Sequence, residues 1–516
     1  FIGTIAAQKL KGQVVDEAGS ALEDVGIFNK TNGQHSHSDG TGHFVLDQTS
    51  VNDTIYFSRL GFETLTMVIS PSDLNNPVTI VLKEGSISLD QVVLVAKVDA
   101  LSRVVDVDVK TNPVKSSQEI LRKVPGLIIG QHAGGGKAEQ LFLRGFDVDH
   151  GTDVAISVDG MPVNMVSHAH GQGYADLHFV IPETIENVNF GKGPYYMEQG
   201  DFNTAGYVDL RLRKRLDKSM LSTEVGQFNT RRFMGMFNVL DQGKSTAYLA
   251  SELYLTDGAF DSPQNFNRLN IMGRYRYALS GDQELLLTAS HFSSKWDASG
   301  QIPQRAIDQG LIGRFGAIDD TEGGQTSRTN FVLDHNKNLG TGKSLHTMAF
   351  VSHYDFELYS NFTFFLEDPV NGDQIRQKEN RILMGAKTVF QDDSAQLGKL
   401  RFKYNAGIGF RYDNVDDMEL SHTRNRQELL ERLAYGDVDE VNTYGFAGAV
   451  FKSGKFTLEP AVRLDYFKFD YLNKLSSVYD NQSDEKVAFS PKFNTIYSPT
   501  ENTQIFLKTG IGFHSK

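Results

Sequence analysis

The chain has 516 residues, 40% of them hydrophobic and 22% charged, and it carries a net charge of −13. This length exceeds one ordinary domain, so two or three domains or one very large one are expected, while the negative charge counts against a nucleic-acid partner, which needs a basic surface. The absence of cysteine excludes disulfides, thiolate metal sites and a cysteine nucleophile.

The 48 glycines, 35 phenylalanines and 19 tyrosines favour β structure. No apolar run reaches about 18 residues, so no transmembrane helix is predicted. The start, "FIGTIAAQKLKGQVV", passes from an apolar stretch ending in small residues into a polar one. Residues 1–9 are therefore predicted to be the remnant of a secretory signal peptide that lacks its front part, and the protein is expected to be exported. A disordered terminus is the alternative.

Residues 10–84 predict a small antiparallel β-sandwich. Short β-prone runs are separated by turn residues, as is typical of such sandwiches; these are Asp16, Gly19, Asn32-Gly33 and Asp39-Gly40. The stretch resembles the carboxypeptidase-regulatory-like domain found ahead of some outer-membrane receptors. The residues that carry this resemblance are Gly12, Val14, Val25, Asp39-Gly40, Gly42 and Phe44.

A linker over residues 85–100 contains one extended apolar segment. Its residues are Leu89, Asp90, Gln91, Val92, Val93, Leu94 and Val95. A flexible arm with such a segment is suited to adding a strand to the sheet edge of another protein. The alternative is an ordinary edge strand that packs on its own domain.

Residues 101–213 predict a mixed α/β domain. Ser116-Ser117 precedes a short helical period, and β-prone runs follow in "QLFLRGF" and "VAISVDGMPV". The region contains a series of motifs in a fixed order: Leu143-Arg144-Gly145-Phe146, Val158-Asp159-Gly160, Ile181-Pro182-x-x-Ile185-Glu186-x-Val188, Gly191-x-Gly193-Pro194 and Ala205-Gly206-x-Val208. This order resembles the plug domain of TonB-dependent outer-membrane receptors. On that resemblance Leu89–Val95 is similar to the TonB box, and TonB with its inner-membrane energising complex is the implied partner.

Residues 214–516 predict long strands with one apolar and one polar face. In "RFKYNAGIGFRYD" Phe402, Tyr404, Ala406, Ile408, Phe410 and Tyr412 share one face, and polar residues and glycines share the other. The same alternation recurs in "FTLEPAVRLDYF", and in "TQIFLKTGIGF" it places Ile505, Leu507, Ile511 and Phe513 on one side. Such alternation is typical of a transmembrane antiparallel β-barrel. Arg401, Lys403 and Arg411 on the polar face are expected to contact acidic residues of the plug, with plain hydration of the lumen as the alternative.

The barrel region contains roughly thirteen such segments, whereas single-chain bacterial barrels have even totals. Plugged outer-membrane transporters have about 22 strands. The resemblance therefore implies that the chain ends within an incomplete barrel. The predicted fold class is mainly β: an N-terminal β-sandwich, an α/β plug and an incomplete transmembrane antiparallel β-barrel.

The segment "PVNMVSHAHGQGYADLHF", residues 162–179, contains the candidate site. His168 and His170, two apart, would point the same way from an extended chain and so could bind one metal ion, and Asp176 and His178 follow closely. In the resembling receptors this segment runs through the outward-facing apical loops of the plug. His168, His170, Asp176 and His178 are therefore predicted to bind substrate, with His168 and His170 as possible metal ligands. Solvated or structural histidines are the alternative, for these residues and for a similar group at His35, His37 and His43.

No nucleophile elbow, zincin motif, complete phosphate loop or dinucleotide fingerprint is present. No catalytic residue, cofactor or enzyme activity is therefore predicted. The resemblance implies a receptor in the outer membrane of a Gram-negative bacterium, in contact with its lipid, that takes up a scarce nutrient with energy from TonB. A metal chelate such as a siderophore, or a metal ion, is the expected cargo. The alternatives are an outer-membrane signalling or adhesion protein and, less favoured, a secreted metal-dependent enzyme.

Overall fold

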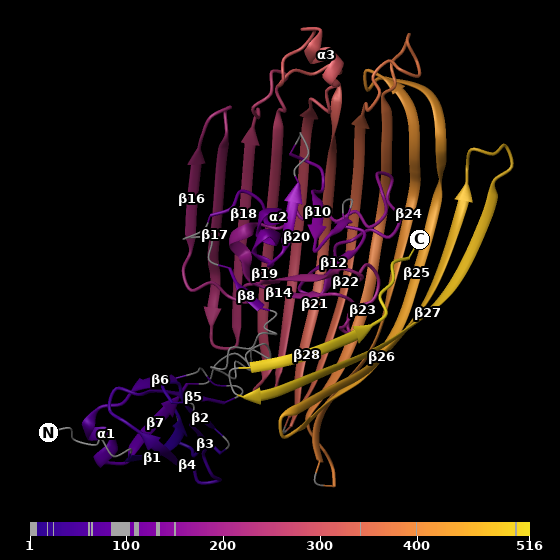
Figure 1. The fold of residues 1–516 in the computed structure, drawn as a ribbon. Helices are drawn as coiled ribbons and strands as arrows, with labels where there is room; N and C mark the ends of the chain where they lie inside the picture. The colour runs from indigo at the N-terminus through magenta and orange to yellow at the C-terminus, as the bar shows by residue number, and fades with distance from the viewer. Residues whose placement is uncertain are drawn as a thin grey trace. The chain divides into compact units, whose positions relative to one another are not determined.

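The computed structural model describes residues 8–17, 19–23, 25–32, 34–59, 62, 65–83, 104–107, 113–130, 135–148, 151–340, 342–398, 400–500 and 503–515. The chain divides into two compact units, one formed mainly by the first hundred residues and the other by the remainder (Figure 1). The predicted box, Leu89–Val95, and residues 1–7 lie outside the described residues. No helix within the described ranges is long and apolar enough to cross a membrane.

The N-terminal unit is a β-sandwich with one short helix, α1 (Pro71–Asn75). Its strands are β1 (Gln8–Asp16), β2 (Gly26–Asn29), β3 (His35–His37), β4 (His43–Thr49), β5 (Thr54–Ser58), β6 (Leu65–Val68) and β7 (Val78–Leu82). One sheet has the order β4-β1-β7 and the other β3-β2-β5-β6. The predicted sandwich is confirmed, but it is not wholly antiparallel, because β1 and β7 run parallel. On β4 the alternation buries Phe44 and Leu46 and exposes His43 and Val45, which gives the strand one core face.

The plug is an α/β domain within the second unit. Its helical turns are α2 (Ser117–Ile120), η1 (Leu121–Lys123) and η2 (Pro182–Thr184), and its strands are β8 (Val104–Asp106), β9 (Leu127–Gly130), β10 (Gln140–Leu143), β11 (Phe146–Val148), β12 (Val154–Val158), β13 (Met161–Pro162), β14 (Ile185–Lys192) and β15 (Gly206–Leu212). A five-stranded sheet has the order β13-β12-β15-β14-β8, with β12 parallel to β15. The chain leaves this sheet after β13 and returns to it only at β14, and the predicted site lies in between.

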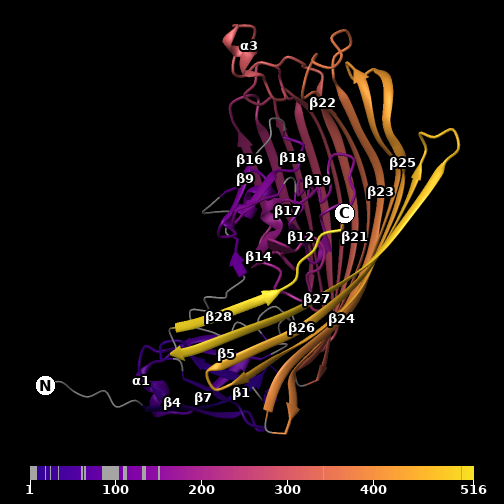
Figure 2. The same ribbon diagram turned by 45° about the vertical axis from the view of Figure 1, so that its right-hand side comes forward.

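The remaining strands form one sheet of thirteen in sequence order. They are β16 (Met220–Val225), β17 (Arg231–Gln242), β18 (Ser245–Thr256), β19 (Phe266–Ser280), β20 (Gln283–Ala298), β21 (Glu322–Gly340), β22 (Lys343–Ser360), β23 (Ile375–Leu397), β24 (Leu400–Arg424), β25 (Glu428–Ser453), β26 (Phe456–Asn473), β27 (Asp480–Thr500) and β28 (Thr503–Gly510). The sheet curves, and the plug lies on its concave side (Figure 2).

The predicted alternation of faces is confirmed on β24. Ile408 is 70% exposed on the outer face, whereas Asp413 on the inner face is fully buried. The apolar outer residues from Phe402 to Tyr412 cover about 25 Å of height for a strand tilted by roughly 40°, and this is the height of the apolar band of a membrane barrel. Near the lower edge of the band Phe402 stacks on Phe451 of β25, with ring centroids 5.2 Å apart, as in an aromatic girdle.

The two ends of the sheet differ in the length of their connections. At one end each hairpin turn has two residues, for example between β17 and β18. At the other end the longest connections cover residues 299–321, which include helix α3 (Gln304–Asp308), and residues 361–374 (Figure 1). Membrane barrels have short periplasmic turns and long extracellular loops, so the end that carries α3 is the extracellular end.

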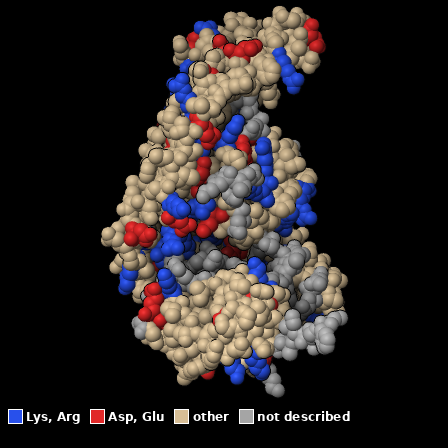
Figure 3. All heavy atoms as spheres, turned by 90° about the vertical axis from the view of Figure 1, so that its left-hand side faces the viewer, with Lys and Arg blue, Asp and Glu red and all other residues tan. Residues whose placement is uncertain are grey.

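The plug and the inner face of the sheet share one hydrophobic core. Val158, Val188 and Val208 of the plug belong to the same buried cluster as Met272 and Phe350 of the sheet. On the face seen from the β16 side, acidic and basic side chains are interspersed with one another (Figure 3). The plug is therefore fixed to the wall by apolar packing and, as described next, by polar bonds.

Candidate functional site

The predicted segment, residues 162–179, runs along the barrel wall and is bound to it near both ends. At its start the Arg328 guanidinium on β21 donates to the Pro162 carbonyl oxygen over 3.3 Å. At its end the same guanidinium lies 4.5 Å from the ring centre of Phe179, and Asn270 of β19 donates to the His178 carbonyl oxygen over 3.0 Å. Residues 162–179 are called the wall loop below.

His168 is buried between the plug and the wall, with 6% of its surface exposed. Its ring stacks on Tyr174, with centroids 4.1 Å apart, and meets Phe356 of β22 edge-on at 4.6 Å. Nδ1 accepts the His170 backbone N–H over 3.1 Å, so the neutral ring carries its proton on Nε2, which lies 3.2 Å from the Tyr354 hydroxyl. The His168 ring thus joins the wall loop to β22.

His170 is only partly buried and contacts the neighbouring strand. Its Nδ1 lies 2.8 Å from Oε1 of Gln377 on β23, and because an amide oxygen can only accept, Nδ1 donates this bond. The amide nitrogen of Gln377 donates to the Ala169 carbonyl oxygen over 2.9 Å. Gln377 therefore connects the imidazole of His170 to the backbone of the wall loop.

Asp176 and His178 form a buried pair within the wall loop, with 6% and 5% of their surfaces exposed. Oδ1 of Asp176 accepts the backbone N–H of His178 over 2.8 Å and its ring Nδ1–H over 2.7 Å. Burial by itself would raise the pKa of Asp176, but the charge and hydrogen bonds of His178 hold it below its ordinary value. Burial and the Asp176 charge raise the pKa of Tyr174 well above its ordinary value, so its hydroxyl stays protonated.

The sequence contains two groups of closely spaced histidines, one in the wall loop and one in the N-terminal unit. Within the described part of the chain, no three or more His, Asp or Glu side chains are grouped so that they could hold a metal ion. In the N-terminal unit His35 and His37 lie on β3 and His43 on β4, all three exposed. The assignment of His168, His170, Asp176 and His178 to cargo binding, and of the first two to metal, stays a prediction.

A cluster of four buried charged side chains and the partly buried Arg411 on β23–β25 lies at the middle of the wall loop, and sequence reasoning missed most of them. This charged clamp consists of Glu379, Arg381, Arg411, Asp413 and Glu440. Arg381 donates to Glu379, Asp413 and Glu440 over 3.0, 2.8 and 3.3 Å and also to the Ser167 carbonyl oxygen. Glu440 and Glu379 accept the backbone N–H groups of Ser167 and Ala169 over 3.0 and 2.8 Å.

The expectation that Lys403 and Arg411 contact acidic plug residues is wrong for the hydrogen-bond partners of both. Arg411 does interact through its charge with the plug residue Asp201: burial raises the pKa of Asp201, and Arg411 is among the groups that oppose this. Arg411 donates to Asp413 over 2.7 Å, and Lys403 donates to Asp393 over 2.9 Å, so both carboxylates belong to the wall itself. Each carboxylate lies on the same or the next strand and is nearer than the plug. The side chain of Arg401 lies outside the described residues.

A second charged cluster binds the plug to the first barrel strands. Arg232 of β17 reaches both carboxylate oxygens of the plug residue Glu183 over 2.8 Å and donates to Glu252 of β18 over 2.7 Å. Arg268 of β19 bonds the same Glu252 over 2.9 Å and the Lys115 carbonyl oxygen over 3.1 Å. Bidentate guanidinium–carboxylate pairs are geometrically specific, so this cluster fixes the orientation of the plug.

A glycine loop of the plug fits beneath the single tryptophan of the chain. Trp296 of β20 is 1% exposed, and a Cβ added to Gly136 would lie 2.0 Å from its ring. Only glycine at position 136 therefore allows this contact. Burial lowers the pKa of the neighbouring Lys137 side chain, and the charge of nearby Glu322 opposes this lowering.

Replacing Gly136 by alanine is expected to destabilise plug docking by about 1–3 kcal/mol, because an overpacked contact must shift the ring or the backbone. The fluorescence of Trp296 measures this directly. We expect its emission to move to longer wavelength as the ring becomes exposed, whereas Gly171→Ala, where an added Cβ meets no atom within 4 Å, should leave the emission unchanged.

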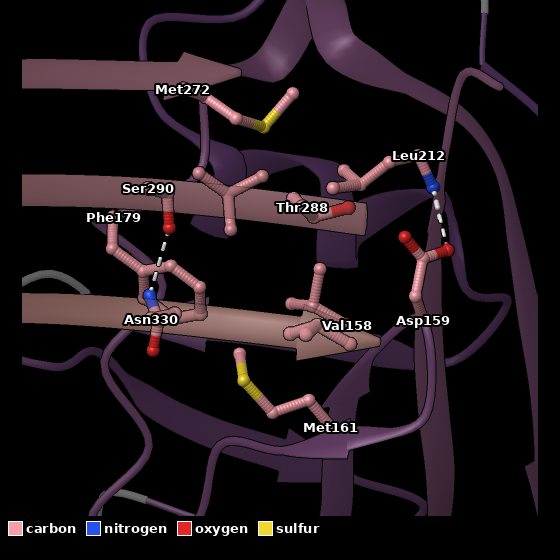
Figure 4. Close-up of a pocket in the computed structure, with 11 residues that line it drawn as sticks. Val158, Asp159, Met161, Phe179, Leu212, Met272, Thr288, Ser290 and Asn330 are labelled. Carbon is pink, nitrogen blue, oxygen red and sulfur yellow. Dashed lines mark hydrogen bonds between the residues drawn. The ribbon is translucent and has the colours of Figure 1, made fainter. Parts of the chain in front are cut away.

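A small cavity separates the plug from the middle of the wall (Figure 4). Val158 and Met161 line it from the plug, and Met272, Asn330 and Val332 line it from β19 and β21. Two of its polar lining side chains are bonded to each other, since Asn330 donates to the Ser290 hydroxyl oxygen over 3.0 Å. Atoms around a void lack van der Waals partners on one side, so the packing between plug and wall is incomplete here.

Comparison with known families matches the architecture. The model of the TonB-dependent receptor-like β-barrel matches residues 253–515, just over half of the chain. The models of the TonB-dependent receptor plug domain and of the CarboxypepD_reg-like domain match residues 97–207 and 10–94. The chain belongs to the TonB-dependent receptors, and its sheet is that of an outer-membrane β-barrel.

Solved structures share the fold at low identity. The ferric citrate transporter FecA in its unliganded form is 13% identical, with a TM-score of 0.68 over 80% of this chain and 62% of that chain. The ferric-catecholate import receptor Fiu from E. coli K12 is 13% identical, with a TM-score of 0.61 over 80% and 69%. The ferric yersiniabactin uptake receptor FyuA from Yersinia pestis is 13% identical, with a TM-score of 0.59 over 78% and 63%. This chain thus spans less than two thirds of FecA, and all three neighbours are transporters or receptors.

Proposed function

We propose that this protein imports a scarce nutrient across the outer membrane with energy supplied by TonB, and that its cargo is a metal chelate such as a siderophore, or a metal ion. The observation that carries the proposal is a plug bonded to the inner face of a barrel sheet through its core and two charged clusters. Such a plug must rearrange before cargo can pass, and rearrangement against these bonds requires energy. The iron cargoes of FecA, Fiu and FyuA support the choice of cargo class.

We propose that the wall loop takes part in cargo binding through His170, its less buried imidazole. His168, Asp176 and His178 would support that role by fixing the loop, since their side chains are bonded within the plug or to the wall. Neutral imidazole can donate to or accept from a polar cargo and can also ligate a metal ion. His170 is thus assigned to cargo contact, and the other three residues are assigned to holding the loop in position.

The implied energising partner grips Leu89–Val95 by strand addition. Proline at Val93 removes one backbone donor from such a ladder, so Val93→Pro is expected to abolish uptake while surface binding of cargo persists. Growth of a receptor-deletion strain on a ferric chelate as sole iron source, complemented with each variant, measures uptake.

The matched control is Val93→Ile, which keeps the donor and the β-branched shape and should restore growth. Immunoblots of outer-membrane fractions verify equal receptor levels. Wild-type growth with Val93→Pro would show that the box is misplaced. Failure of every ferric chelate to support growth with the wild-type receptor would instead contradict the cargo class.

A further inference from the structure

Short turns at the end of the sheet opposite α3 share the dipeptide Gly-Lys (Figure 1). It occurs at 243–244, 342–343, 398–399 and 454–455. Gly243 and Gly454 have φ of +54° and +56°, the left-handed region that the first position of a two-residue hairpin turn favours. Turn geometry thus explains the glycine but not the lysine, because Asn, Asp or Ser commonly follows glycine in such turns.

Three of these lysines, Lys244, Lys343 and Lys455, have exposed side chains and are called the turn lysines below. Lys399 lies outside the described residues. The Lys455 ammonium group donates to the Pro499 carbonyl oxygen over 2.7 Å, and no ion pair of Lys244 or Lys455 is found among the residues that the structure describes.

Lys343 is the turn lysine with an acidic neighbour. Its ammonium group lies 3.9 Å from Asp392, and its side chain is 48% exposed. A pair that is this long and this exposed contributes little free energy. All three ammonium groups can therefore bind an anion from outside the protein.

The turn lysines lie just below the lower aromatic girdle of the barrel. Along the strands or across a strand pair, each is within two residues of an outward-facing aromatic residue: Lys244 of Tyr277, Lys343 of Phe390 and Lys455 of Phe456. Phe456 is 52% exposed and stacks on Tyr497 of β27, with ring centroids 4.7 Å apart. Such girdles mark the level where acyl chains meet headgroups.

The height of the turn lysines follows from this girdle. Two residues along a strand tilted by roughly 40° correspond to about 5 Å. The headgroup layer on each side of a bilayer is roughly 5–7 Å thick. The ammonium groups therefore lie in the headgroup layer of the periplasmic leaflet, since the end of the sheet opposite α3 is the periplasmic end.

We infer that the turn lysines bind the phosphate groups of anionic phospholipids in the periplasmic leaflet of the outer membrane. Phosphate is the anion that recurs at this level of a bilayer, and an ammonium group binds it as a compact point charge with three donors. The contacts hold the lower rim of the barrel at headgroup level and enrich anionic phospholipid around it. Neither cargo nor TonB takes part, so the inference is independent of the proposed function.

Mass spectrometry of the intact full-length receptor, released from micelles of a nonionic detergent, counts bound lipids during titration with phosphatidylglycerol. In the triple variant Lys244→Gln/Lys343→Gln/Lys455→Gln we expect the affinity for phosphatidylglycerol to fall about fivefold per site, the equivalent of roughly 1 kcal/mol for each lysine near an anionic surface. Lys→Arg changes at the same three positions keep the charge and should keep the wild-type affinity. Equal urea midpoints verify that the variants fold alike.

The matched control removes the same charge from the extracellular parts of β23, β26 and β27. It is the triple variant Lys378→Gln/Lys468→Gln/Lys486→Gln, which should bind phosphatidylglycerol as the wild type does. An equal loss in the two glutamine variants, or wild-type affinity in the first, would overturn the inference.

Two further ligands separate the alternatives. Phosphatidylcholine, which has no net charge, should bind the wild type more weakly than phosphatidylglycerol, and equal affinity would overturn the preference for anionic lipid. Purified peptidoglycan should sediment equal amounts of the wild type and the first glutamine variant. If the variant lost sedimentation but kept lipid binding, the turns would belong to a contact with the cell wall, and the inference would be wrong.

Discussion

Replacing Arg381 by methionine is expected to destabilise the folded receptor by about 3–5 kcal/mol, the usual cost of removing one partner from a buried ion cluster. Arg381 is fully buried and bonds three carboxylates, Glu379, Asp413 and Glu440. Methionine fills most of the volume but leaves these carboxylates with one guanidinium group, that of Arg411. The urea midpoint, followed by Trp296 fluorescence, reports the loss because that ring contacts the plug.

Arg424→Met is the matched control for this effect. Arg424 pairs with Glu428 at the surface, where the two side chains are 43% and 53% exposed. Exposed pairs contribute roughly 0–1 kcal/mol, so its midpoint should stay close to that of the wild type. Similar shifts in the two variants would mean that the clamp contributes no more than a surface pair.

The faces of the barrel strands could be predicted from sequence because they depend on a local period. Side chains alternate strictly along a strand, so Ile408 and Arg411 were assigned to opposite faces correctly. This alternation of side chains holds only as far as the strand continues. Phe513 was expected on the face of Ile505, but β28 stops at Gly510, and the Phe513 ring instead packs against buried Phe467 at 5.7 Å.

The partners in the site could not be predicted in the same way, because they depend on strand register across long sequence separations. His168 lies 186 positions from Tyr354, and Ser167 lies 273 positions from Glu440. Alternation places Glu379 and Arg381, two residues apart, on one face, which was a usable signal for a polar inner cluster. The alternation of faces does not show that these two side chains bind the plug backbone. The partner of Lys403 was predicted wrongly for the same reason, because alternation gives the face of a residue but not its neighbours across strands.

His170→Ala is expected to weaken cargo binding about tenfold, the equivalent of one lost polar contact of roughly 1.4 kcal/mol, with little effect on stability. His168→Ala should do the reverse. Its ring is buried against Tyr174, Phe356 and Tyr354, so truncation should cost about 2–4 kcal/mol through the lost packing and the lost hydrogen bond from the His170 backbone N–H. The double variant should therefore lose both affinity and stability, in contrast to a loop whose histidines are both solvated.

The measurement is the affinity for the ferric chelate that supports growth, determined by titration on the purified single variants, together with the urea midpoint of each. His353→Ala is the control, since His353 lies on the outer face of β22 and its side chain is 49% exposed. Wild-type affinity in His170→Ala, combined with a lowered midpoint in His168→Ala, would leave the wall loop with an anchoring role only. A loss of affinity confined to His168→Ala would instead mean that cargo binding depends on the position of the loop, and that the contact with cargo is made by other residues.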